Sequence, residues 1–205
     1  MSDRLKVAVQ KSGRLLDDSL SLLKECGISI DNGRNQLKAS ARNFPIDVLY
    51  LRNGDIPQYV QDGVADIGII GQNTVIEKEK AIDEVISLGF SKCRLSIATP
   101  RFAKYDGPQW LNGKKIATSY PNSLRAYLKA NELEAEIHEI SGSVEIAPNI
   151  GLADAICDLV STGSTLFKNN LEEQEVMLKS QACIVKNRNL SPAAQQILDK
   201  LVFRI

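Results

Sequence analysis

The sequence predicts an α/β protein of two lobes, each with a mainly parallel sheet. Short apolar strands alternate with helix-sized segments, and the second half repeats the strand–loop–helix opening of the first. A short motif also occurs twice, as Gly63-Val64-Ala65-Asp66 and as Gly151-Leu152-Ala153-Asp154, each time with an apolar strand after it. Ligands of such sheets lie beyond the carboxyl ends of the strands, so we expect the ligand site in a cleft between the lobes.

The elements of the first lobe follow from apolar spacing and from residues that start and stop helices. Gly27 is a C-terminal stop for the first helix, Asp55 is a cap for the second, and Pro57 suits its first turn. The predicted order is strand, helix, strand, helix, strand and strand: Lys6–Val9, Leu15–Cys26, Ile46–Leu51, a helix from Asp55 to near Gly63, Ile67–Ile70 and Leu95–Thr99.

The second lobe is predicted to alternate in the same way, as Lys115–Thr118, Ser123–Ala130, Ala135–Glu139, Glu145–Ile150 and Ala155–Val160. A strand over Ser180–Lys186 and a helix over Ala193–Ile205 follow, and we expect this tail to cross back to the first lobe. The predicted division is therefore residues 1–98 with 180–205 for the first lobe and residues 99–179 for the second.

Charge and hydropathy exclude several classes of function. The 25 basic and 25 acidic residues cancel, so no overall field favours nucleic acid or an acidic membrane. We find no signal-peptide pattern and no apolar run of the roughly 20 residues that a membrane-spanning helix needs. A soluble, cytoplasmic protein is expected. The single histidine, His138, argues against a Ser/His triad or a histidine-based metal site.

The strongest local signal is a small hydroxyl-rich turn after the apolar strand Ala155–Val160. Its residues are Ser161, Thr162, Gly163, Ser164 and Thr165, and a helix-like segment follows. Glycine permits close backbone approach, and successive N–H groups with hydroxyls suit a phosphate monoester. A Ser/Thr-rich helix cap without a ligand is the alternative. Neither a Walker loop nor a Gly-x-Gly-x-x-Gly motif is present, which disfavours P-loop and dinucleotide binding.

Two further segments have anion-binding character. Lys11 and Arg14 flank a Ser-Gly turn after the first strand, and Arg52 ends the next strand along the chain. Lysine offers a compact charge and arginine a planar fork for phosphate, although a solvated basic turn would look alike. The segment with Gly142, Ser143 and Glu145 forms a second candidate nest. There Glu145 would contact a sugar hydroxyl or a metal-bound water, or simply be an acid at a helix N-terminus.

These motifs together resemble the ATP phosphoribosyltransferases over essentially the whole chain. The matching blocks, in order, are Val9–Leu15, Asp55–Pro57, Asp62–Gly71, Phe90 with Cys93–Leu95, Ile116–Pro121, Gly142–Glu145 with Ala147-Pro148, and Leu152–Leu166. The resemblance implies a fold like the type II periplasmic binding proteins. At Asn53-Gly54 the family more often has acidic residues, so this loop departs from its pattern.

The resemblance also implies the reaction and its residues. N1 of ATP would displace pyrophosphate from phosphoribosyl pyrophosphate (PRPP), with Mg²⁺ on the substrate phosphates rather than on protein ligands. The segment from Asp158 to Leu166 would bind the 5′-phosphate, and Asp154 and Asp158 would lie near the ribose. Lys11 and Arg14 would face the pyrophosphate or the nucleotide phosphates, and Arg52 and Asp66 would lie near the cleft.

Members of this family are long, with a C-terminal regulatory domain, or short, with a separate regulatory subunit. The segments Gln10–Gly13 and Ala155–Asp158 are closer in sequence to the long form, so a long-form catalytic core without that domain is expected. We expect the chain to form at least a dimer. A separate regulatory subunit is the expectation for a true short form. The alternatives are a two-lobed small-molecule binding protein, a phosphoribosyltransferase for another base, and a regulatory paralogue without turnover.

Overall fold

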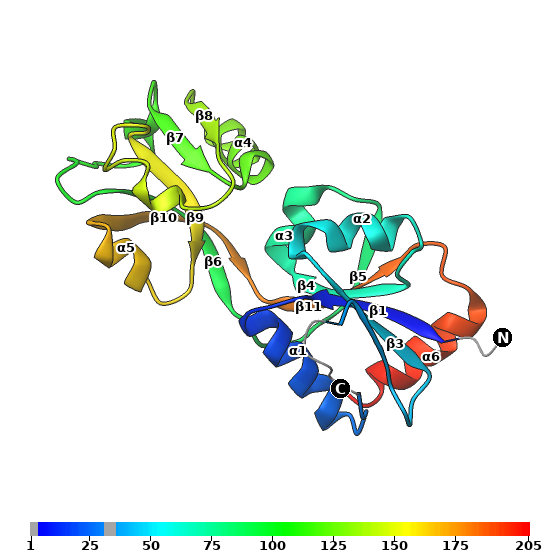
Figure 1. Ribbon diagram of the computed structural model, residues 1–205. Coiled ribbons are helices and arrows are strands. Elements are labelled where there is room, and N and C mark those ends of the chain that lie inside the picture. The colour runs from blue at the N-terminus through cyan, green and yellow to red at the C-terminus, as the bar shows by residue number, and fades with distance from the viewer. Residues whose placement is uncertain (1–3, 31–35) are drawn as a thin grey trace. The chain divides into compact units, whose positions relative to one another are not determined.

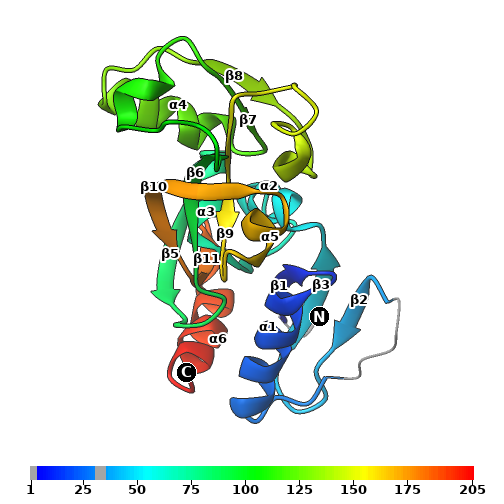
Figure 2. The ribbon, with the colours of Figure 1, turned by 90° about the vertical axis from the view of Figure 1, so that its left-hand side faces the viewer.

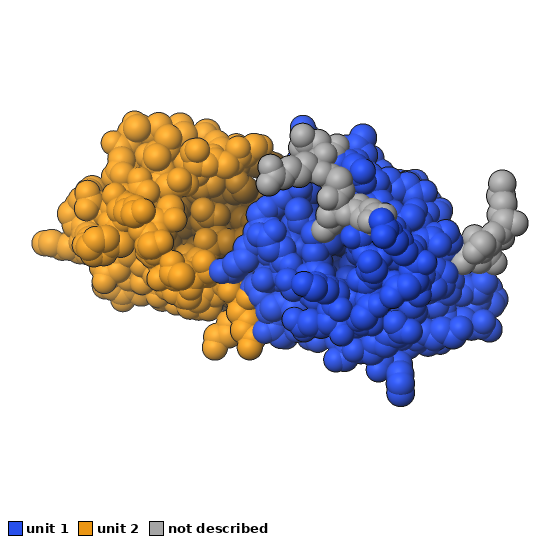
Figure 3. All heavy atoms as spheres, turned by 60° about the horizontal axis from the view of Figure 1, so that its bottom comes forward, with its two compact units in different colours: residues 1–91, 181–205 blue, residues 92–180 orange. Residues whose placement is uncertain are grey.

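The computed structural model describes residues 4–30 and 36–205. They divide into two compact units: unit 1 comprises Met1–Ser91 with Gln181–Ile205, and unit 2 comprises Lys92–Ser180 (Figure 3). The first boundary precedes the predicted one at 98/99, because the strand expected to close the first lobe pairs elsewhere. This strand, β6 (Cys93–Pro100), forms ladders with two strands of unit 2.

Unit 1 is built around one mixed sheet. Its elements are β1 (Leu5–Gln10), α1 (Arg14–Glu25), β2 (Lys38–Ser40), β3 (Ile46–Leu51), the 3-10 turn η1 (Asn53–Asp55), α2 (Ile56–Gln61), β4 (Ile67–Gly71), α3 (Gln72–Lys78), β5 (Ile82–Ser87), β11 (Ala182–Asn187) and α6 (Pro192–Val202) (Figure 1). Among the described residues the sheet has six strands in the order β2-β3-β1-β4-β11-β5. β3, β1 and β4 run parallel, whereas β2 and β11 run antiparallel to their neighbours.

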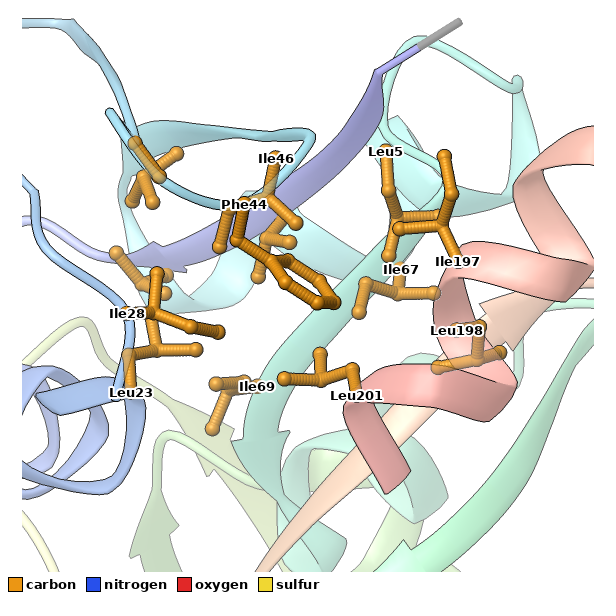
Figure 4. Close-up of a cluster of buried hydrophobic side chains, with 14 of the residues drawn as sticks. Leu5, Leu23, Ile28, Phe44, Ile46, Ile67, Ile69, Ile197, Leu198 and Leu201 are labelled. Atoms are coloured by element: carbon orange, nitrogen blue, oxygen red, sulfur yellow. The ribbon is translucent and has the colours of Figure 1, made fainter. Parts of the chain in front are cut away.

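Alternating side chains of β1 explain why this sheet is covered on both faces. Leu5, Val7 and Val9 enter a cluster with residues of α1 and α6, whereas Ala8 packs on the opposite face with Ile56 of α2. Figure 4 shows the first cluster, in which aliphatic side chains from α1, β1, β3, β4 and α6 surround Phe44. Each fully buried aliphatic side chain contributes about 1.5–3 kcal/mol, so this double burial fixes the register of β1 in the sheet.

Unit 2 has its own sheet. Its elements are β6, the 3-10 turn η2 (Pro108–Leu111), β7 (Lys115–Thr118), α4 (Pro121–Ala130), β8 (Glu136–Glu139), the 3-10 turn η3 (Val144–Ile146), β9 (Ala155–Val160), α5 (Ser164–Lys168) and β10 (Leu171–Ser180). The order is β10-β6-β9-β7-β8, and β9, β7 and β8 run parallel. α4 packs near β8 and α5 near β10 (Figure 2). Together the two sheets confirm the predicted α/β class.

The two faces of the second sheet are covered unequally. Leu124 and Leu128 of α4 pack on one face with Leu95 and the side chains around it. Short elements cover the other face, where Val144 of η3 and Leu166 of α5 contact the side of β9 that carries Ile156 and Val160. Asp158 lies between those two apolar residues on β9, so the alternation of a strand directs it to the same thinly covered face.

The duplicated motif ends in two aspartates that make the same contacts. Oδ2 of Asp66 accepts a hydrogen bond from the Lys6 N–H at 2.7 Å, and the Asp66 N–H donates to the Lys6 carbonyl at 2.9 Å. Oδ2 of Asp154 accepts from the Lys115 N–H at 2.8 Å, and its own N–H donates to the Lys115 carbonyl at 2.8 Å. Each aspartate therefore ties the amino end of its strand to the amino end of the neighbouring parallel strand.

The helices of unit 1 are short. α1 has 12 residues and α6 has 11, and α6 is capped by Ser191, whose hydroxyl accepts a hydrogen bond from the Ala194 N–H. The predicted tail helix extended to Ile205, but α6 ends at Val202. Across the parts of the chain that are described, we find no helix with the length and apolar content that crossing a membrane requires.

Gly68 of β4 lies against α2, with no room for a side chain. A Cβ atom at this position would lie 2.7 Å from Cγ2 of Ile56 and 3.2 Å from Cγ2 of Val60. We predict that Gly68→Ala lowers the free energy of unfolding by about 1–3 kcal/mol, because the packed helix has to shift. Urea denaturation measures this. Gly54→Ala is the matched control, because its Cβ would meet nothing nearer than Cε of Lys78 at 3.6 Å. Equal losses in the two variants would contradict this account.

Candidate active site

The carboxyl ends of three parallel strands meet at one edge of the unit 2 sheet. Thr118, the last residue of β7, is paired with Glu139 of β8 and with Cys157 of β9. The loops after these strands therefore start from the same edge. We call this the carboxyl edge of unit 2. It comprises Ser119, the segment 141–145, Asp158, and the phosphate loop Ser161–Thr165.

Short hydrogen bonds hold the first two of these loops together. The Thr118 hydroxyl donates to the Cys157 carbonyl at 2.8 Å and accepts from the Tyr120 N–H at 2.8 Å. The Ser119 hydroxyl donates to the Ile140 carbonyl at 2.7 Å and accepts from the Gly142 N–H at 3.2 Å. The predicted residues Gly142 and Ser143 are thus fixed at the carboxyl edge by the neighbouring loop.

The phosphate loop turns through Gly163 into α5. Gly163 is the N-cap of this helix with φ 82° and ψ 0°, the left-handed conformation that favours glycine. The hydroxyls of Thr162 and Ser164 lie 3.1 Å apart, and buried Leu166 anchors the loop to the core. N–H groups in the first turn of a helix have no intrahelical acceptor, so this exposed turn offers N–H and O–H donors to an anion.

Two acidic side chains accompany the phosphate loop. Burial raises the pKa of Asp158, and the charge of Glu145 raises it further; a hydrogen bond from the Leu159 N–H, at 2.8 Å from Oδ1, opposes the shift. The carboxyl group of Asp158 therefore costs the folded state free energy when it is ionised. Such a cost next to an anion-binding loop is typical of a residue kept for function.

An ion pair that the sequence did not indicate lies beside the loop. Arg94 of β6 donates through Nε and Nη2 to the carboxylate of Glu173 on β10, each at 2.5 Å, and through Nη1 to the Ser161 carbonyl at 3.2 Å. The Ser96 hydroxyl donates to the same carboxylate at 2.6 Å. Cys93-Arg94-Leu95 was noted only as a matching block, and the strand that carries Glu173 was not predicted.

Unit 1 presents its cations at the carboxyl ends of β1 and β3. The last residues of these parallel strands, Gln10 and Leu51, are paired, and the Lys11 N–H donates to the Leu51 carbonyl at 2.8 Å. Arg52 follows Leu51, and Arg14 opens α1 after Gly13. Lys11, Arg14 and Arg52 are all exposed at this edge. The structure thus brings the three predicted cations to one edge of one sheet.

Asp66 and Asp154 are not brought to these edges. Both lie at the amino ends of β4 and β9, where their carboxylates bind backbone N–H groups of the neighbouring strands. β9 separates Asp154 from the phosphate loop by its whole length of six residues, which is about 20 Å. Asp154 instead lines a separate hollow of about 500 Å³ with Trp110 and Lys115. The structure therefore does not bring Asp66 and Asp154 together with the other predicted site residues, because their carboxylates bind backbone N–H groups.

Within residues 4–30 and 36–205, no three side chains of His, Cys, Asp or Glu gather in a way that could hold a metal ion. The pair Asp158 and Glu145 offers oxygen donors of the kind that Mg²⁺ accepts, but two carboxylates do not make an all-protein cage. The donor set of the carboxyl edge fits an ion that keeps substrate phosphates and water among its ligands.

A hydroxyl-rich loop on one unit and clustered cations on the other define a phosphate-handling α/β protein with two units. Comparison with known proteins gives the family. The family model for ATP phosphoribosyltransferase (HisG) matches residues 52–205. The ATP phosphoribosyltransferase of Cytophaga hutchinsonii is 57% identical over 205 residues, which are 100% of this chain and 72% of that protein.

Solved structures agree with this assignment. The ATP phosphoribosyl transferase (HisG:HisZ) complex from Thermotoga maritima contains a chain that is 28% identical, with a TM-score of 0.83 over 98% of this chain and 95% of that one. The arginine-bound form of truncated ArgBP from T. maritima is 13% identical with a TM-score of 0.60, over 98% of this chain and 95% of that one, and shows likeness of fold alone. These structures confirm the binding-protein-like fold that the resemblance to the ATP phosphoribosyltransferases implied.

The chain belongs to the ATP phosphoribosyltransferase family. It is a pentosyltransferase of the first step of histidine biosynthesis, in which N1 of ATP displaces pyrophosphate from PRPP to give N1-(5-phosphoribosyl)-ATP. The predicted family, reaction and enzyme class are confirmed.

We predict that Asp158→Asn separates stability from activity. The pKa of Asp158 is raised in the folded state, so the ionised carboxylate opposes folding at neutral pH. This cost in free energy disappears as the pH falls through the folded-state pKa to the lower pKa of the unfolded chain. The neutral amide removes the cost. The melting temperature should therefore rise or stay equal, while kcat/KM for PRPP falls about 10–100-fold through loss of a charged contact.

Calorimetry and initial-rate kinetics at pH 7 measure the two effects. Glu134→Gln, at an exposed position of unit 2, is the control for removal of an acidic charge. A lower melting temperature with unchanged kcat/KM would assign Asp158 a purely structural role.

Proposed function

We propose that this chain holds PRPP at the carboxyl edge of unit 2, with the phosphate loop on the 5′-phosphate. The exposed turn around Gly163 supports this proposal most directly, because it combines a left-handed glycine with hydroxyls at Ser161, Thr162, Ser164 and Thr165. A phosphate monoester has several acceptor oxygens, and the loop supplies several donors without a cation.

Asp158 and Glu145 are proposed to face the ribose, with Gly142 and Ser143 beside them. Carboxylates accept hydrogen bonds from sugar hydroxyls, and a negative group near C1 favours the positive charge that this carbon develops as pyrophosphate leaves. The raised pKa of Asp158 supports the proposal, because the site maintains a carboxyl group in surroundings that oppose its ionisation.

Lys11, Arg14 and Arg52 are proposed to bind the pyrophosphate of PRPP or the phosphates of ATP. The position of Arg14 supports this reading. It is the first residue of α1, where the partial positive charge of the helix dipole disfavours a cation, and Gly13 supplies no capping side chain. Residues that break a local rule are expected at functional sites, and an anionic ligand would compensate for this cation at the helix start.

The chemistry asks for electrostatic stabilisation more than for proton transfer. N1 of neutral adenine carries no proton, so its attack on C1 needs no strong base. The C1–O bond to pyrophosphate breaks as the N1–C1 bond forms, and negative charge builds on the leaving oxygen. Contacts from Arg14 and Lys11 that strengthen with this charge lower the barrier.

Mg²⁺ is proposed to enter with the substrate phosphates. When bound, it supplies positive charge to the leaving pyrophosphate. Glu145 would contact a water molecule bound to the ion, in keeping with the preference of Mg²⁺ for few protein ligands.

We further propose that the chain works in the cytoplasm as a homo-oligomer of at least two copies. The related T. maritima chain is part of a HisG:HisZ complex, which supports a separate regulatory subunit for this chain if it is a true short form. Size-exclusion chromatography with light scattering, in the presence and absence of histidine, measures the assembly.

A turnover assay with ATP, PRPP and Mg²⁺ tests the proposed roles, with the formation of N1-(5-phosphoribosyl)-ATP as the measured signal. We predict that Arg14→Ala lowers kcat about 100-fold, the cost of removing one contact to transition-state charge. Its melting temperature should not fall, because a cation leaves the positive end of a helix.

Arg188→Ala is the matched control. It removes an exposed arginine of the same unit, which forms an ion pair with Asp83 at 2.9 Å. Arg188 lies outside the carboxyl edge of unit 2 and away from the carboxyl ends of β1 and β3. Activity equal to that of the unaltered protein in Arg14→Ala, or an equal loss in both variants, would remove Arg14 from the site.

A further inference from the structure

Arg94 and Glu173 make contacts that reach the phosphate loop without belonging to it. Resting on the proposed function of that loop, we propose that these two residues form a positioning pair that orients the loop for PRPP. Arg94 binds Glu173 with Nε and Nη2, each at 2.5 Å, and binds the carbonyl of Ser161, the first loop residue, with Nη1 at 3.2 Å. The guanidinium thus connects β10 to the start of the loop.

The planar peptide group explains how one carbonyl contact orients the anion site. In a trans peptide, the carbonyl of Ser161 and the N–H of Thr162 point in opposite directions. When Arg94 holds the oxygen, the Thr162 N–H is aimed away from Arg94. The same contact keeps a carbonyl oxygen, which would repel an anion, from turning into the site. Arg94 therefore sets the direction of a donor that it does not touch.

A bulge in β10 brings Glu173 to the face of the sheet that it needs. Glu173 is paired with Ala98 of β6 and Glu175 with Ile97, so one extra residue, Gln174, lies between them. Glu173 contacts Arg94 and Ser96, whereas Glu175 accepts a hydrogen bond from Tyr105 at 2.7 Å. In a regular strand these two glutamates would share one face. Bulges commonly re-aim a side chain beside an active site.

The pair is held in its ionised form. The hydrogen bonds from Arg94, together with one from Ser96, lower the pKa of Glu173 against the opposing effect of burial. The hydrogen bond to Glu173 likewise raises the pKa of Arg94. The side chains are 31% and 24% exposed, so solvent screens them only in part. Each of the three guanidinium nitrogens donates a hydrogen bond within the protein, which directs the guanidinium toward Glu173 and the Ser161 carbonyl.

The test is steady-state kinetics of the full chain with PRPP and ATP varied separately. Arg94→Lys keeps the charge but loses the planar fork, and Glu173→Gln keeps the shape but loses the charge. Each should raise KM for PRPP about tenfold, the effect of one charge-assisted hydrogen bond, and leave KM for ATP within twofold. Glu173→Ala should raise KM for PRPP more than Glu173→Gln does.

Tyr105→Phe is the matched control, because it removes a hydrogen bond to the same strand on the other side of the bulge. It should lower the melting temperature and leave KM for PRPP unchanged. If Arg94→Lys and Glu173→Gln behave as this control does, the pair is structural and the inference fails. A parallel rise of both KM values also overturns it.

Thr162→Val separates this inference from the proposed function. A raised KM for PRPP in Thr162→Val, without one in Arg94→Lys, overturns the positioning pair and leaves the phosphate loop in place. An unchanged KM in Thr162→Val removes the loop from the PRPP site, and both proposals fall together.

Discussion

Parallel pairing of β7 with both β8 and β9 determines where the chemistry of unit 2 can lie. The pairing places Thr118, Glu139 and Cys157 side by side, so the chain leaves all three strands at the same edge. Burial fixes this register, because Ile116 and Ala155 face the cluster under α4, and a slip of one residue would turn them toward the other face. The loops proposed to bind anions are therefore neighbours as a consequence of core packing.

At the amino ends of the strands, the two units share the same aspartate-to-backbone contact. Asp66 in unit 1 and Asp154 in unit 2 close the same pair of hydrogen bonds with Lys6 and Lys115. Each contact fixes the start of a strand whose far end presents functional groups. In each unit these contacts lie at the amino ends of the strands, whereas the partly buried Asp158 and the exposed Arg14 lie toward the carboxyl ends. This separation is the usual arrangement of a strained site on a stable scaffold.

Much of this arrangement could be predicted from the sequence, and the failures have physical causes. β3, β7 and β9 coincide with their predicted ranges. In β3 and β9, apolar residues such as Ile, Val and Leu leave little choice of structure. β10 escaped prediction because Glu, Leu, Met and Lys favour helices, and pairing with β6 overrides that preference. The Arg94–Glu173 pair was lost with it. An aspartate before a strand looks the same in the sequence whether its carboxylate binds backbone N–H groups or a ligand. Asp154 was therefore predicted to lie with the phosphate loop in the PRPP site.

The central claim is that PRPP binds at the carboxyl edge of unit 2. Hydrogen–deuterium exchange with and without PRPP and Mg²⁺ tests it residue by residue. The account predicts slower exchange of the amides in 142–145 and 161–165 on binding, with the amides of 151–154 unchanged. Protection confined to 151–154 and to the hollow beside Trp110, with the phosphate loop unaffected, would contradict it and place the ligand at the other end of β9.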